Sequence, residues 1–348
     1  MPTRITELAQ VFKPLTNGWR PTGTTLVVAR AVISGDITLV AVPLGPRGTA
    51  GAPLPLVSFV PDRWALRPDG GALAVSVWTG HGTRVATWDV GSGAARWLTP
   101  DEPGKSALSP LWSMDGTSIY YLSTDDELKT AAIFRIGADG VAGRQLRVPV
   151  PRMYSLDGLT PDGGGLVITR SSAGGWGWIE VFDIATGVSH HIERVARITS
   201  WRARQPRALL TFGGCCPSQP GGELVLWDDV AMTSRVLAEQ GQSGDPSWVD
   251  GSWDPSGTRI AAVRLENAAQ RASASIETSL VVIDAETGAV QPIADTKGAG
   301  QVLWLSEGIV FTRPLRNGVE VMLLPNGGGP AVSVYQDSGL IQRIEVLR

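Results

Sequence analysis

Short apolar segments alternate with turn sequences along the whole chain. The segment 66–77, L-R-P-D-G-G-A-L-A-V-S-V, recurs as L-T-P-D-G-G-G-L-V-I-T at 159–169 and as W-D-P-S-G-T-R-I-A-A-V at 253–263. Pro presets φ for a tight turn, Asp bonds back to nearby backbone, and Gly accepts a positive φ. Each copy therefore predicts a tight β-hairpin. Because no segment carries a long 3.6-residue apolar period, we expect little helix.

The hairpin returns at a spacing of roughly 45–50 residues, a period typical of propeller arrays. A second hairpin follows in each unit, and its first strand ends in an Asp or Gly turn. The first turns are P-T-G at 21–23, P-D-G at 68–70, M-D-G at 114–116, P-D-G at 161–163, R-Q-P-R at 204–207, P-S-G at 255–257 and S-E-G at 306–308. The clearest second turns are T-W-D-V-G-S-G at 87–93, V-F-D-I-A-T-G at 181–187 and V-I-D-A-E-T-G at 282–288. Four short strands per unit make one propeller blade.

We predict an all-β fold, a β-propeller of four-stranded antiparallel blades, as a single domain over residues 1–348. Seven blades begin near 17, 61, 106, 152, 196, 245 and 298, with six or eight as alternatives. The tail 339–348 resembles an extra innermost strand, and the segment 5–12 resembles an outermost one. Either could complete a blade built from both ends of the chain, which would leave no unpaired strand edge.

The two turn patterns carry a family resemblance. A hydrophobic-x-P-D-G-x-x-L/I-A/V-V segment followed by an x-D-x-x-T-G turn resembles the WD40-like PD40 repeat. That repeat builds the C-terminal propeller of the TolB family and the propellers of prolyl-oligopeptidase-type proteins. The resemblance covers nearly the whole chain and is weakest in the third, fifth and seventh units. It implies the propeller fold and a non-catalytic platform that binds a protein or peptide. TolB proteins carry an additional N-terminal domain, for which we expect no room in this chain.

The charge and the length of the apolar runs limit the classes of partner that we expect this protein to bind. The 348 residues carry a formal net charge of −3, which does not favour a nucleic acid. No apolar run approaches the roughly 18 residues of a membrane helix, so we expect no membrane insertion. The N-terminus has no apolar signal region. We expect a soluble protein, cytoplasmic if Met1 is the native start and exported if a signal segment was removed.

The order of the hairpins sorts the connections onto two ends of each blade. With strands named A to D from the inside outwards, the A–B and C–D turns lie at one end, here called the turn end. The B–C and D–A connections lie at the other, the loop end. The loop-end connections are the long ones, such as 171–178, 212–222 and 265–278. Since variable loops on a rigid scaffold commonly carry binding, we predict that the loop end is the working surface.

Arginine ends strand B in four units, and further Arg and Trp residues lie in the adjoining loops. The predicted partner-binding residues are Arg30, Arg170, Arg264, Arg271, Arg313, Arg316, Trp176 and Trp178. They favour an acidic protein or peptide. The alternative is that these Arg side chains pair with neighbouring carboxylates. The other tryptophans singled out, Trp88, Trp112, Trp227, Trp248 and Trp304, are expected in the core.

Two other functions stay open. An enzyme could use His81, Asp125, Asp126 and Arg residues converging at the loop end, although three His in the chain argue against it. The chain could instead be a sensor or regulatory ectodomain of a longer protein. There is no G-x-S-x-G nucleophile motif, no phosphate-binding G-x-x-x-x-G-K-S/T and no Cys/His cluster, so we predict no cofactor and no metal. The adjacent Cys215 and Cys216 are either a plain loop pair or a redox-responsive disulfide.

Overall fold

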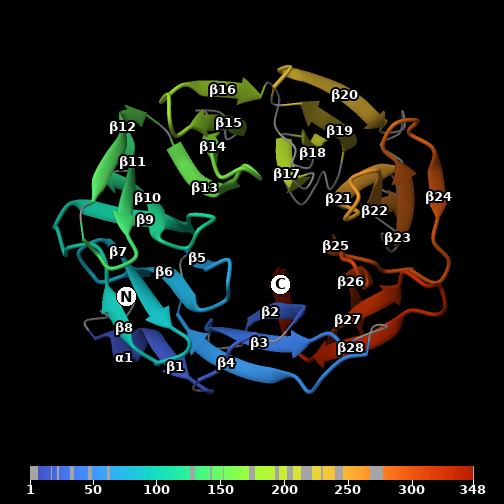
Figure 1. The fold of residues 1–348 in the computed structure, drawn as a ribbon, viewed down its shortest axis with the longest axis horizontal. Coiled ribbons are helices and arrows are strands. Elements are labelled where there is room, and N and C mark those ends of the chain that lie inside the picture. The colour runs from blue at the N-terminus through green and yellow to red at the C-terminus, as the bar shows by residue number, and fades with distance from the viewer. Residues whose placement is uncertain are drawn as a thin grey trace. The chain divides into compact units, whose positions relative to one another are not determined.

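The structure is a computed structural model, and β-strands make up nearly all of its regular elements. It describes residues 7–347, with gaps at 17, 22, 32–34, 46–48, 61–62, 126–129, 142, 152, 172–176, 193–195, 202–206, 213–221, 229, 240–245 and 267–276. Within these residues the strands form seven sheets, one of five strands and six of four. The four-stranded sheets are antiparallel and follow one another along the chain (Figure 1). The fold is a β-propeller of four-stranded antiparallel blades, as the turn spacing predicted.

Contacts divide the chain into two compact units, and the first comprises 1–43, 52–192 and 341–348. It holds three four-stranded blades in which neighbouring strands are also neighbours in sequence. Blade 2 contains β5 (Arg63–Leu66), β6 (Ala72–Trp78), β7 (Thr83–Asp89) and β8 (Ala95–Trp97). Blade 3 contains β9 (Lys105–Trp112), β10 (Ser118–Asp125), β11 (Thr130–Gly137) and β12 (Arg144–Pro151). Blade 4 contains β13 (Met153–Leu159), β14 (Gly165–Ser171), β15 (Gly177–Asp183) and β16 (Ser189–Ile192).

The five-stranded sheet, blade 1, joins strands from both ends of the chain. Its order is β1-β4-β3-β2-β29. The strands are β1 (Phe12–Pro14), β2 (Thr25–Ala31), β3 (Ile37–Pro43), β4 (Leu54–Phe59) and β29 (Leu340–Leu347). The C-terminal tail therefore supplies the strand beside β2, as predicted, and buries Ile341, Ile344 and Leu347.

Two details of the blade 1 prediction are wrong. The segment before the P-T-G turn was expected to be strand A, but residues 18–21 form no strand and β29 takes that place. The segment 5–12 was expected to be an outer strand, but Leu8–Val11 is a short helix, α1, and only β1 pairs with β4. The cause of the first error is that local turn chemistry cannot show which distant segment fills the place beside β2.

The second unit comprises 44–51 and 193–340 and holds three four-stranded blades. Blade 5 contains β17 (Ala196–Trp201), β18 (Arg207–Phe212), β19 (Glu223–Asp228) and β20 (Thr233–Ala238). Blade 6 contains β21 (Ser247–Trp253), β22 (Arg259–Glu266), β23 (Glu277–Asp284) and β24 (Val290–Pro292). Blade 7 contains β25 (Val302–Trp304), β26 (Gly308–Leu315), β27 (Gly318–Pro325) and β28 (Val332–Asp337).

The repeated turns have the geometry that their residues predicted. The A–B glycines Gly70, Gly116, Gly163 and Gly257 have φ of 73°, 67°, 73° and 71°. In the C–D turns of blades 2, 4 and 6, the Asp carboxylate receives two bonds from the Thr or Ser three residues later. Asp183 Oδ1 accepts the backbone N–H of Thr186 at 2.7 Å and its hydroxyl at 2.8 Å. The same pair of bonds joins Asp284 to Thr287 and Asp89 to Ser92. The D-x-x-T/S-G motif is thus a self-contained turn.

Apolar layers between successive blades form the core of each unit. In the first unit, Trp112 of blade 3 packs with Ala74 and Val85 of blade 2. In the second, Trp253 and Ile260 of blade 6 pack with Leu224 of blade 5. The tryptophans expected in the core are buried, with Trp88, Trp112, Trp227, Trp248 and Trp304 all less than 8% exposed. That prediction is confirmed.

Candidate functional site

The two ends of the blades differ in how their connections are built. At the loop end, the B–C connection is only 316–317 in blade 7 but spans 267–276 in blade 6. At the turn end, the A–B connections of blades 2 to 6 are all five residues long, and the C–D connections are four to six residues long except for 44–53 in blade 1. Variation is therefore concentrated at the loop end, where the predicted partner-binding residues lie.

In blade 4, the structure joins Arg170 to an acidic partner and an aromatic one. Arg170 Nη1 lies 3.0 Å from Oε2 of Glu180, whose side chain is 2% exposed. The Arg170 guanidinium also lies 5.7 Å from the ring centre of Trp178, its cross-strand neighbour. The Trp178 ring is 5.3 Å from that of His191. Trp178 was expected in an exposed loop, but it lies within β15 and is half-buried, because the strand alternation begins before it.

In blade 7, Arg313 makes a similar pair. Its Nε and Nη2 lie 2.7 Å and 2.6 Å from Glu320 Oε1, across the β26–β27 ladder. The Glu320 side chain is 4% exposed and the Arg313 side chain is 35% exposed. Gln336 Nε2 donates to the second Glu320 oxygen at 3.3 Å. The Glu320 carboxylate thus has a partner on each oxygen.

The remaining predicted residues are less constrained or lie elsewhere. Arg264 Nε lies 3.4 Å from Glu266 Oε1, and both side chains are partly exposed. Arg316 is exposed in the β26–β27 turn, and Arg30 is half-buried in β2 opposite Thr38. Arg271, Trp176, Cys215, Cys216 and Asp126 lie outside the described residues. The role of all these residues in partner binding stays a prediction.

The acidic partners Glu180 and Glu320 were missed in the sequence. Both interrupt an apolar alternation on strand C, in W-I-E-V-F-D and G-V-E-V-M-L. A charged residue at a buried strand position needs a partner of opposite charge. Since Arg ends the preceding strand B in both blades, the Arg–Glu pairs could have been predicted from these two features together.

The residues of the predicted enzyme site are not brought into one cluster in the described part of the chain. His81 is exposed in the β6–β7 connection. Asp125 Oδ2 accepts a hydrogen bond from the Thr130 hydroxyl at 3.1 Å. Among the described residues, no group of three His, Cys, Asp or Glu side chains could hold a metal ion. No helix in the described ranges is both long enough and apolar enough to span a bilayer.

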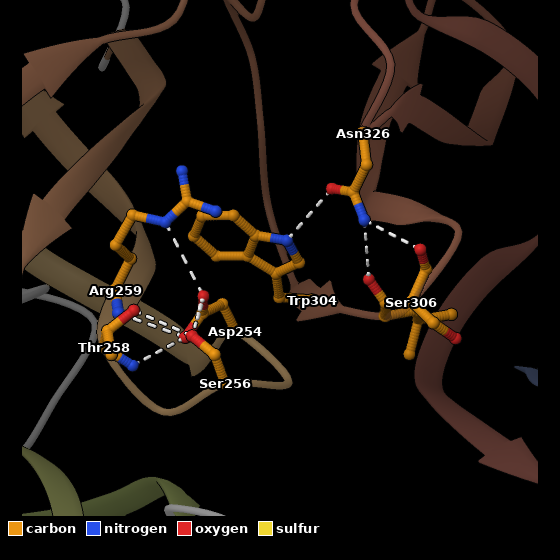
Figure 2. A network of polar contacts seen from close by, with 8 residues as sticks. Asp254, Ser256, Thr258, Arg259, Trp304, Ser306 and Asn326 are labelled. Atoms are coloured by element: carbon orange, nitrogen blue, oxygen red, sulfur yellow. Dashed lines mark hydrogen bonds and ion pairs between the residues drawn. The ribbon is translucent and has the colours of Figure 1, made fainter.

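The turn end is dominated by structural bonds, and blades 6 and 7 show this best. Asp254 Oδ1 accepts the backbone N–H groups of Thr258 at 2.8 Å and Arg259 at 3.0 Å. In Figure 2 the Arg259 guanidinium lies over the Trp304 indole, 4.9 Å from its ring centre. Trp304 Nε1 in turn donates to Asn326 Oδ1 at 3.3 Å. This network ties the turns of one blade to the inner strand of the next.

Acidic side chains in these turns are held in the charged form. The Ser113 hydroxyl, with the backbone and hydroxyl of Thr117, lowers the pKa of Asp115 to about 2. The backbone N–H and hydroxyl of Ser92 lower the pKa of Asp89, and those of Thr186 lower the pKa of Asp183. Hydrogen bonds to a carboxylate favour its ionised form, so ionisation of these Asp side chains stabilises the turns.

Comparison with known proteins identifies the fold. No family model matches the chain, and no curated protein matches its sequence. Among solved structures, it is 14% identical to TolB from Acinetobacter baumannii, with 80% of this chain and 66% of that chain covered and a TM-score of 0.46. A puromycin-hydrolyzing peptidase of Mycobacterium tuberculosis is 15% identical, with 89% and 53% covered and a TM-score of 0.59. An oligogalacturonate lyase solved with manganese is 13% identical, with 92% and 86% covered and a TM-score of 0.58.

These likenesses concern architecture. The chain spans just under two thirds of the length of this TolB and about half that of the peptidase. At identities of 15% and 13%, the peptidase and the lyase show the fold and not the activity. The chain is a β-propeller, and its repeat sequence resembles the PD40 repeat of TolB and related proteins.

Proposed function

We propose that this chain is a non-catalytic binding platform that presents the loop end of its blades to an acidic protein or peptide, with residues 1–348 acting as one domain. The observation that supports this most is the contrast between the two blade ends. The B–C connections range from 316–317 to 267–276, while at the other end the A–B connections of blades 2 to 6 are all five residues long and the C–D connection is long in blade 1 alone, at 44–53. Scaffolds that bind partners commonly vary loops at one end of a constant framework.

The Arg side chains at the loop end are suited to bind carboxylates of an acidic partner. The pairs with Glu180 and Glu320 hold Arg170 and Arg313 in fixed positions, and these two Arg side chains remain 20% and 35% exposed. A guanidinium has five N–H donors in a planar fork, so it can bind a second carboxylate while keeping the first. Arg316 is exposed beside Arg313 on the short β26–β27 turn. A partner carboxylate is therefore expected to approach blade 7 here.

The experiment is partner capture followed by mapping. Partners captured on the full chain are purified, and cross-linking with mass spectrometry locates their contacts. Binding is then measured at low and high salt for the parent chain, for Arg316→Glu, and for Arg20→Glu as a control at an exposed turn-end site. We expect Arg316→Glu to slow association and Arg20→Glu to leave it unchanged, because rim charges act mainly on the association rate. Cross-links confined to the turn end would refute the proposal.

A further inference from the structure

A cavity of about 180 Å³ lies at the turn end between blades 2 and 3, away from the surface proposed above. Its walls combine two cations, one anion, a hydroxyl and an indole among small alanine side chains. The polar and aromatic lining residues are Arg67, Arg96, Asp89, Thr87 and Trp112. Buried cavities of about 150 Å³ accommodate a ligand the size of benzene, so this space suits a small molecule.

Thr87 is the lining residue that distinguishes blade 2 from blades 4, 5 and 6. It is 5% exposed and contributes to the cavity wall, where its hydroxyl is open to a ligand. Blades 4, 5 and 6 place an apolar residue at the same position, two before the C–D turn Asp. These equivalents are Val181 in blade 4, Leu226 in blade 5 and Val282 in blade 6. Blade packing in those three blades therefore does not need a hydroxyl, and Thr87 adds a polar group to the cavity wall.

The corresponding place between blades 5 and 6 shows what a filled version looks like. There Arg235 donates to the carbonyls of Ala285 and Glu286, just as Arg96 donates to those of Ala138 and Asp139. Leu226, at the Thr87 position, packs against the apolar core of those two blades. Arg96 thus ties adjacent blades together in the ordinary way, and the smaller, polar Thr87 is what distinguishes the cavity.

The charges around the cavity are the Arg67–Asp69 ion pair, Arg96 and Asp89, and Arg67 also attracts Asp89 electrostatically. Arg67 binds Asp69 with Nε to Oδ1 at 2.7 Å and Nη2 to Oδ2 at 3.0 Å. Arg96 lies directly across the β7–β8 ladder from Thr87. Asp89 keeps a low pKa because Ser92 donates to it, and both Ser92 bonds use Oδ1. No described residue donates to Asp89 Oδ2. The cavity thus offers a positive group beside Thr87 and a negative group two residues along the same strand.

We propose that this cavity binds a free α-amino acid as its zwitterion. The ligand carboxylate would bind the Arg96 guanidinium and the Thr87 hydroxyl, and the ammonium group would bind Asp89 Oδ2. Thr87 and Asp89 lie on one face of β7, about 6–7 Å apart at a rise of roughly 3.3 Å per residue. That separation suits two donor–acceptor contacts to adjacent groups of one small molecule. The ligand side chain would lie against the alanines and Trp112. A dianion such as phosphate is disfavoured by Asp89.

The test uses three matched probes with one carbon skeleton. L-valine carries both charges, isovalerate lacks the ammonium group, and isobutylamine lacks the carboxylate. In calorimetric titrations of the full chain, we expect valine to bind at least about tenfold more tightly than either analogue, since each loses one charge-assisted contact. Isovalerate binding as tightly as valine would overturn the proposal. So would the absence of binding by alanine, valine and phenylalanine at millimolar concentration.

Variants separate the ligand site from the fold. Thr87→Leu copies blade 5 and fills the cavity, so binding should be lost while the melting temperature is kept or raised. Asp89→Asn keeps the acceptor for Ser92 and removes the charge, so valine affinity should fall on the order of tenfold. Its matched control is Asp183→Asn, which alters the same turn in blade 4, where Val181 replaces Thr87. Equal losses of affinity in Asp89→Asn and Asp183→Asn, or full binding by Thr87→Leu, would overturn the proposal.

Discussion

The ion pair between Arg313 and Glu320 allows a sharp test of how the loop end is built. We consider the charge reversal Arg313→Glu. It removes the contacts at 2.6 Å and 2.7 Å and places a second carboxylate beside Glu320, which is 3% exposed. Gln336 Nε2 still donates to the other Glu320 oxygen. The buried acid then lacks a compensating charge.

The expected loss of unfolding free energy depends on how deeply the ion pair is buried. Removing one partner of a buried ion pair costs about 3–5 kcal/mol, but exposed pairs are worth only about 0–1 kcal/mol. Because the Arg313 side chain is 35% exposed, solvent screens part of the interaction. We therefore expect a loss of about 2–3 kcal/mol in unfolding free energy. Arg264→Glu is the matched control, because its pair with Glu266 is longer, at 3.4 Å, and Glu266 is 44% exposed. We expect that change to cost at most about 1 kcal/mol.

The assay is urea denaturation of the parent chain and of both variants. The Arg313→Glu loss should shrink as the pH falls, because protonation of either carboxylate relieves the repulsion. The double variant Arg313→Met/Glu320→Met should be much closer to the parent than Arg313→Glu, since an apolar pair leaves no buried charge. Equal losses for Arg313→Glu and Arg264→Glu would refute the reasoning, as would an Arg313→Glu loss that does not depend on pH.

Other predictions concern the turns, pH, cooperativity and the Cys pair. Gly163→Val should cost on the order of 1–3 kcal/mol because Gly163 has φ of 73° and a Cβ there would lie 3.0 Å from Met114 Cγ. Gly143→Val is its control in thermal melts, because a Cβ added at Gly143 would have no atom within 4 Å. Lowered pKa values such as that of Asp115, about 2, stabilise the fold above pH 4, so the melting temperature should fall between pH 4 and 2 and fall less in Asp115→Asn. If residues 1–348 are one domain, calorimetry should show one unfolding transition; two resolved transitions would contradict this. Intact-mass analysis should find Cys215 and Cys216 as free thiols, and a loss of two hydrogens would contradict that.

The sequence predicts the blades well because their determinants are local. A turn such as 68–70 fixes its own geometry through Pro, Asp and Gly, and the flanking alternation fixes the strands. The predicted start of blade 3 near 106 agrees with β9 at Lys105, and the start of blade 4 near 152 agrees with β13 at Met153. The strand that pairs beside β2 was harder to predict. Its identity as β29 depends on pairing between the two ends of the chain, which turn chemistry does not encode.

The candidate sites were predicted only in part. The Arg residues that end strand B were found because they repeat, but the carboxylates that hold Arg170 and Arg313 were not. The cavity beside Thr87 could not be located from sequence, since it depends on side-chain volumes in two adjacent blades. Its one visible sign was the threonine in V-A-T-W-D, where blades 4, 5 and 6 have an apolar residue.

The repeats allow each unusual residue to be judged against its equivalents in the same chain. Glu180 is buried where the corresponding residues, three before the C–D turn Asp, are Ala86, Val225 and Val281. Its burial is explained within the chain, because Arg170 supplies the opposite charge at 3.0 Å. Thr87 is an exception relative to Val181, Leu226 and Val282, and it lines the cavity between blades 2 and 3. A buried polar group is stable when its hydrogen bond is made. Glu180 is therefore accounted for by an ion pair within the chain, whereas the Thr87 hydroxyl contributes to a cavity wall, where a ligand could bind it.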